Sequence, residues 1–158
     1  MRSVLGWGLA LVLGLAAVAG GVLLLQSRDD AGVEKAAGPG ERVEARCPDR
    51  AAPIAHDARP LSDDQLRHAL ALGDVVLRYR GTRPPRPLRQ LQEELTGPFD
   101  AEIAAAGQAV ILAPGAGSSR VEALAWGRRL RSSSAASPQL REFAEAWLGE
   151  GAPEPCGP

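Results

Sequence analysis

Ser62–Arg80 reads SDDQLRHALALGDVVLRYR, a helix pattern followed directly by a strand pattern. The serine at its start and Gln65 three residues later form the pattern of a capping box, in which each side chain bonds the other residue's backbone N–H. Gly73 suits the left-handed position that ends many helices, so we expect a helix over Asp63–Leu72. The remainder, Asp74–Arg80, is rich in β-branched and aromatic residues and predicts a strand.

The sequence after this stretch continues the mixture of helices and strands. Pro87 suits the first turn of a second helix, which ends at a Gly-Pro pair. Two apolar runs, Gln108–Ala113 and Val121–Leu130, predict strands, the second with a bulge at Gly127. Because a short loop joins these two runs, we expect them to pair antiparallel. Ser137 and the proline after it begin a last helix with apolar residues every three to four positions.

The segment Val4–Leu25 carries no charge and no proline. As a helix it would span roughly 33 Å, close to the hydrocarbon core of a bilayer, which predicts a transmembrane helix. The alternative is a cleaved signal peptide with a small-residue site at Ala17–Ala19, but apolar residues continue past that site. Arg2 before the segment favours a cytoplasmic N-terminus and a domain outside the cell membrane.

These patterns together predict an α+β fold: an N-terminal transmembrane helix, then a small two-layer domain with about three strands and three to four helices in the order α-β-α-β-β-α. We expect residues 1–26 to form the anchor or signal peptide. Residues 27–46, rich in Gly, Ala, Glu and Arg, predict a flexible linker. Residues 47–158 then form the extracytoplasmic domain.

Cys47 and Cys156 are the only cysteines, and they stand at the two borders of the predicted domain. In an oxidising compartment two such thiols would form a disulfide, whereas two free thiols on frayed ends are the alternative. Closing so long a loop stabilises a domain by up to about 4.7 kcal/mol in the chain-entropy model. We therefore expect a disulfide and an exported domain.

The charge pattern restricts the classes of ligand. A formal net charge of −1 argues against a nucleic-acid-binding protein, which usually presents a strongly basic face. The chain has no G-x-S-x-G motif, no phosphate-loop motif and only two histidines, so we predict no catalytic residue, no metal and no cofactor. The residues best suited to contact a ligand, such as a lipid headgroup or an anionic surface polymer, are His68, Arg78, Arg80 and Arg128.

Three stretches resemble a bacterial family called domain of unknown function 3105. They are His68–Tyr79, then Val110–Pro114 with the Ala-Trp-Gly-Arg element that ends at Arg128, and finally Phe143–Pro155. The resemblance implies a single-pass, mainly actinobacterial protein with its domain outside the membrane and no established activity. This chain departs from the family pattern: Ala71 and Leu72 replace a Glu-His pair, and a Pro-Pro-x-Ser-Gly-x-His stretch is missing.

We therefore expect a single-pass, membrane-anchored envelope protein whose domain binds a partner without catalysis. The expected partner is a cell-envelope protein or an anionic surface polymer. The alternative is an extracytoplasmic metal-assisted hydrolase that uses His68 with an acidic residue such as Asp64 or Asp74.

Overall fold

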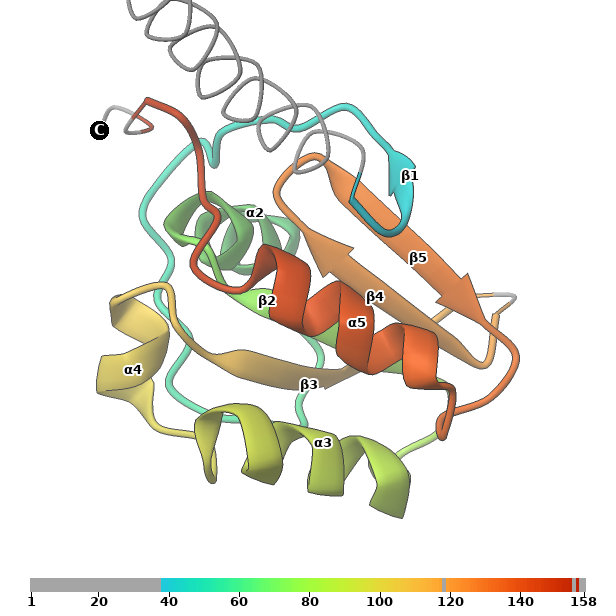
Figure 1. Ribbon diagram of the computed structural model, residues 1–158. Coiled ribbons are helices and arrows are strands. Elements are labelled where there is room, and N and C mark those ends of the chain that lie inside the picture. Colours follow the sequence, from blue (N-terminus) through green and yellow to red (C-terminus); the bar gives the residue numbers. More distant parts are fainter. Residues whose placement is uncertain (1–37, 118, 155, 157–158) are drawn as a thin grey trace, which may run out of the picture. The chain divides into compact units, whose positions relative to one another are not determined.

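The computed structural model describes residues 38–117, 119–154 and 156 (Figure 1). A compact unit begins at Pro39. The predicted membrane span Val4–Leu25 lies outside the described residues. Among the residues that the structure describes, no helix has the length and apolar character needed to cross a membrane. The transmembrane helix of the predicted fold class is thus not found among the described residues, whose helices are the short ones of an α+β domain.

The described residues form five strands and four helices, against the three strands expected. The helices are α2 (Asp63–Leu72), α3 (Arg86–Thr96), α4 (Ala101–Ala105) and α5 (Pro138–Trp147). The strands are β1 (Glu41–Arg42), β2 (Val75–Tyr79), β3 (Val110–Pro114), β4 (Val121–Ala125) and β5 (Arg128–Ser132).

The sheet is mixed, with the strand order β1-β5-β4-β2-β3. Strand β2 runs parallel to β3, while the other neighbouring strands pair antiparallel. The expected pairing of β3 with β4 is wrong, since β2 lies between them. The expected single strand Val121–Leu130 is a hairpin instead, because the chain turns at Trp126 and at Gly127, whose φ is 65°. Strand β1 lies within the segment that composition predicts to be a linker.

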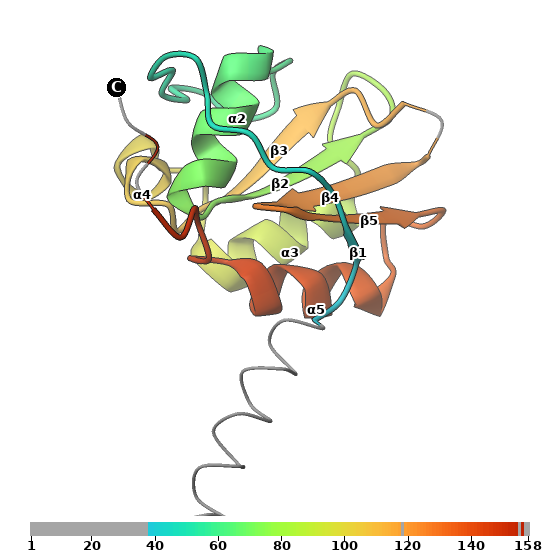
Figure 2. The same cartoon turned by 90° about the horizontal axis from the view of Figure 1, so that it is seen from above.

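Helices cover both faces of the sheet, so the domain has three layers and the two-layer prediction was wrong (Figure 2). Helices α3 and α5 pack on one face, where Leu77 and Phe143 belong to the larger core cluster. Helix α2 lies on the other face, where Ala69 and Val76 belong to a smaller cluster. Since side chains alternate along a strand, the buried run of β2 supplies residues to both clusters.

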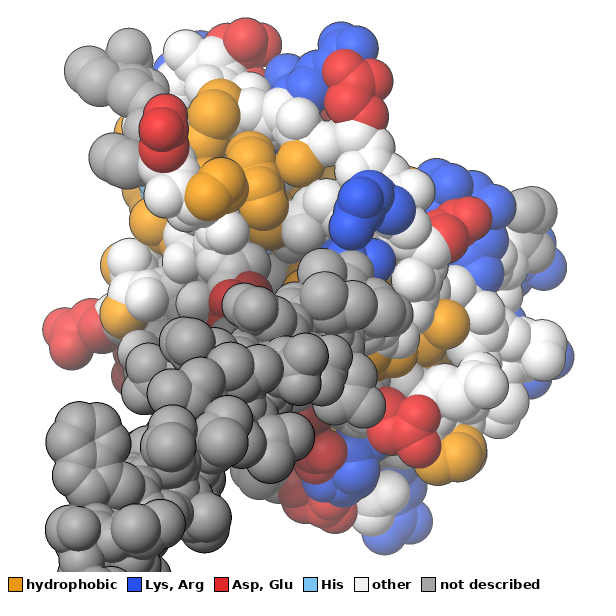
Figure 3. Space-filling view, turned by 45° about the horizontal axis from the view of Figure 1, so that its top comes forward, with side chains coloured by type: hydrophobic (Ala, Val, Ile, Leu, Met, Phe, Trp, Pro, Cys, Tyr) orange, Lys and Arg blue, Asp and Glu red, His pale blue; other side chains and the backbone are white. Residues whose placement is uncertain are grey.

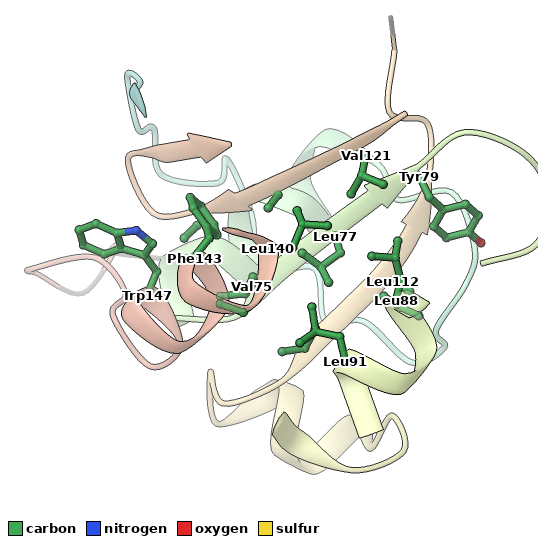
Figure 4. Packing of buried hydrophobic residues seen from close by; sticks show 14 residues of the cluster. Val75, Leu77, Tyr79, Leu88, Leu91, Leu112, Val121, Leu140, Phe143 and Trp147 are labelled. Atoms are coloured by element: carbon green, nitrogen blue, oxygen red, sulfur yellow. The ribbon is translucent and has the colours of Figure 1, made fainter. Parts of the chain in front are cut away.

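The larger core lies between the sheet and the helices α3 and α5 (Figure 4). Leu77, Leu112 and Phe143 are fully buried there. Trp147, at the end of α5, is also buried and donates an indole N–H to the carbonyl oxygen of Pro39 at 2.8 Å. This bond, with β1, ties the start of the compact unit to the core.

The expected helix signal before β2 is confirmed in detail. The Ser62 hydroxyl accepts a hydrogen bond from the backbone N–H of Gln65 at 3.2 Å, and the Gln65 side chain accepts one from the N–H of Ser62 at 3.1 Å. Gly73 ends the helix with a φ of 116°. The backbone carbonyl of Gly73 then accepts a bond from the N–H of Gly149, so the chain after α5 runs across the end of α2.

The two ends of the domain are joined by the predicted disulfide between Cys47 and Cys156, whose Cα atoms lie 5.5 Å apart. The bond closes a sequence separation of 109 residues. The Ala152 N–H donates to the carbonyl of Ala71 at 2.9 Å, which holds the C-terminal segment against α2 on its way to Cys156. The disulfide thus restrains a chain end that backbone hydrogen bonds already position.

Candidate functional site

The predicted ligand residues do not converge on one site. His68 lies half-buried on α2, and the described residues contain no cluster of three or more His, Cys, Asp or Glu side chains that could hold a metal. The carboxylates proposed for a hydrolase are engaged elsewhere: Asp64 pairs with Arg50 at 2.9 Å, and Asp74 accepts a bond from the N–H of Ala109 at 2.9 Å. No observation therefore favours the hydrolase.

Arg128 has a structural position rather than an exposed one. Arg128 is only 9% exposed, and its guanidinium carbon lies 4.5 Å from the centre of the Trp147 ring. Such stacking of a cation on an indole contributes about 0.5–2 kcal/mol. The Arg128 side chain is directed towards α5, on the sheet face opposite α2. We therefore assign Arg128 a role in packing and not in ligand binding.

Arg78 and Arg80 do lie together, at the end of β2. Arg78 stands opposite Glu122 on β4, and Glu122 stands opposite Arg131 on β5. The Glu122 carboxylate lies 3.5 Å from each of these two guanidinium groups. The three side chains form a row across three strands, with neighbours about 4.8 Å apart along the row.

A second row lies just beyond the ends of the same strands, two residues along the chain from the first. The backbone N–H of Arg80 donates to the carbonyl of Arg120 at 3.1 Å, and the β4–β5 pairing ends at Val121 with Ser132, next to Arg120 and Ser133. If the alternation of the strands continues, Arg80 and Arg120 share the face of Arg78 and Glu122, roughly 7 Å away, and Arg80, Arg120 and Ser133 line one hollow. We call the two rows the arginine grid: Arg78, Glu122 and Arg131, then Arg80, Arg120 and Ser133.

The second row opens into a hollow of about 370 Å³. Arginines and serines line it, and no carboxylate is among the described residues that do so: Arg80, Ser119, Arg120, Arg131, Ser132 and Ser133. Basic side chains gather on this side of the molecule (Figure 3). Guanidinium groups and hydroxyls are hydrogen-bond donors, so the hollow can bind an anion.

Two other polar positions are buried away from the grid. Burial raises the pKa of the Asp74 carboxyl to about 7, although the bond from Ala109 partly opposes this shift. The Tyr79 hydroxyl is buried and has no partner among the described residues, and burial, helped by the Asp57 carboxylate, raises its pKa. Neither group belongs to a metal-binding cluster in the described part of the chain, and we do not assign a site to either.

The sequence indicated two of the grid's four arginines, Arg78 and Arg80, and neither of the other two. The spacing of Arg78 and Arg80 predicts a shared strand face, but Arg120 and Arg131 join them only through strand pairing. An arginine before β4 and another late in β5 were the available signal. Arg131 could be placed opposite Glu122 only once Val121–Leu130 was known to form two paired strands.

Comparison with known proteins gives a family for this chain and no activity. Over residues 50–157, more than half of the chain, it matches the family described as "Protein of unknown function (DUF3105)". That is the family its motifs resemble. No curated protein and no solved structure matches the chain.

Proposed function

The chain belongs to the DUF3105 family, whose description carries no activity, and we propose from its own residues that the domain is a non-catalytic binding module for an anionic polymer of the cell envelope. The arginine grid carries the proposal. Within this set arginines outnumber carboxylates four to one, and Glu122 is already shared between Arg78 and Arg131. The second row and its hollow therefore present a local positive charge on a chain whose formal net charge is −1.

The disulfide supports a location outside the cytoplasm. Disulfides persist in oxidising compartments and are rare in reducing ones. Peptide mapping of the protein from cells, under non-reducing conditions, is expected to yield a linked Cys47–Cys156 peptide. Thiols that are free and readily alkylated in the cell would contradict an exported domain.

Binding is tested with the full-length, oxidised chain and three polyanions at low salt: dextran sulfate, polygalacturonate and long-chain polyphosphate. We expect at least one to bind with an affinity that falls as salt screens the charges. Replacing Arg120 and Arg131 together by Gln should weaken binding at least tenfold. Arg141→Gln on α5, at the opposite face of the sheet, removes the same kind of charge and serves as the control. If none of the polyanions binds, the proposal fails.

A further inference from the structure

We propose that the group held in the hollow is a phosphate group rather than a carboxylate, an inference that rests on the proposed function. The hollow receives arginines from three places in the chain: Arg80 after β2, Arg120 before β4 and Arg131 on β5. Each guanidinium is a planar array of five N–H donors, of which Arg80 already gives one to the carbonyl of Gly117 at 3.2 Å and Arg131 gives one to Glu122 at 3.5 Å.

The directions of the donors select the ligand. A carboxylate has two oxygens that accept hydrogen bonds close to one plane. A phosphate group presents its oxygens in tetrahedral directions, so it can accept from guanidinium groups that approach from different parts of the chain. The Ser133 hydroxyl, exposed beside Arg120, adds a donor that can rotate to the remaining oxygen.

Glu122 limits how the ligand lies. Its carboxylate occupies the middle of the first row, held by Arg78 and Arg131 at 3.5 Å each. A second phosphate in that row would stand within about 5–7 Å of a like charge. A bound polymer therefore places one phosphate in the hollow. The rest of the polymer extends past Ser119 and Ser133, away from Glu122.

The test compares ligands of different anionic groups on the full-length, oxidised chain. The probes are long-chain polyphosphate, polygalacturonate of matched charge number, inorganic phosphate and phosphatidylglycerol vesicles. We expect polyphosphate or the vesicles to bind at least tenfold more tightly than polygalacturonate, and inorganic phosphate to compete. Binding of polyphosphate would indicate that the phosphate belongs to a polymer, and binding of the vesicles would indicate that it belongs to a lipid.

Arg120→Lys separates geometry from charge, because lysine keeps the charge and loses the planar array of donors. We expect at least a fivefold loss of affinity for the phosphate probe and less than a twofold change for polygalacturonate. If polygalacturonate binds as tightly as the phosphate probes, or if Arg120→Lys binds like the wild type, the phosphate assignment is overturned while the proposed function stands. Binding of no probe overturns both.

Discussion

The Asp57 carboxylate accepts a hydrogen bond from the backbone N–H of Leu112 at 2.8 Å, although the two residues are 55 positions apart. The next residue, Ala58, donates its own N–H to the carbonyl of Leu112 at 2.9 Å. These bonds lay the loop before α2 along the outer edge of β3, where an uncovered strand would be open to pairing with another chain. The other oxygen of Asp57 accepts from Arg89 at 3.0 Å and Gln92 at 3.3 Å on α3.

Asp57→Ala is therefore expected to destabilise the domain by about 2–3 kcal/mol, since it leaves the N–H of the buried Leu112 without its acceptor. Asp57→Asn keeps an acceptor oxygen and should cost about half as much. Urea unfolding measures both values. Asp49→Ala removes an exposed carboxylate 3.5 Å from Arg67 and should change stability by less than about 0.5 kcal/mol. Equal losses for Asp57→Ala and Asp49→Ala would refute this role.

The buried Asp74 predicts a pH dependence of stability. Burial raises the pKa of its carboxyl in the folded domain from 3.8 to about 7. Between these pH values the folded state holds a proton that the unfolded chain releases, so stability falls as pH rises, by up to about 1.4 kcal/mol per pH unit. Asp74→Asn keeps an acceptor for the N–H of Ala109 and removes the titration.

Unfolding free energies of wild type and Asp74→Asn should thus agree most closely near pH 4 and diverge towards pH 7, with the variant more stable. Subtracting the two curves cancels every other titrating group that the substitution leaves unchanged. A difference that stays constant from pH 4 to 8 would show that Asp74 titrates normally.

Local signals in the sequence specify α2 and β2 well, because a capping box and a β-branched run act within a few residues. The sheet order was beyond such signals, since the position of β2 between β4 and β3 depends on contacts distant in sequence. Gly127 illustrates the limit: a glycine among strand residues fits a bulge or a turn, and only the pairing of Ala125 with Arg128 distinguishes them. Arg131 was not predicted to join the grid for the same reason, because it is linked to Arg78 only through Glu122 on another strand.

Gly107 occupies a position that accepts no side chain. A Cβ atom added there would collide with the backbone carbonyl of Leu72, where the loop before β3 passes the end of α2. Gly107→Ala is expected to destabilise the domain by more than about 3 kcal/mol, because a left-handed alanine costs about 1–2 kcal/mol and backbone must also move. Gly97→Ala is the matched control, since its φ of 78° is close to the 71° of Gly107 and no atom lies within 4 Å of its added Cβ. Thermal unfolding that gives the two variants the same loss would exclude the close approach.

Glu122→Gln isolates the electrostatics of the arginine grid in a single substitution. Glutamine retains the shape of the side chain and a hydrogen-bond acceptor for Arg78 and Arg131, but removes the negative charge beside the hollow. A unit charge about 7 Å away is worth on the order of 0.6 kcal/mol even in water, so the affinity for long-chain polyphosphate should rise threefold or more at low salt. The gain should shrink as salt is added, because screening weakens the repulsion that the variant relieves.

Glu142→Gln, an exposed position on α5, changes the net charge by the same amount and should leave affinity within twofold. A folded Glu122→Gln variant that binds polyphosphate no better than Glu142→Gln would place the anion somewhere other than the grid.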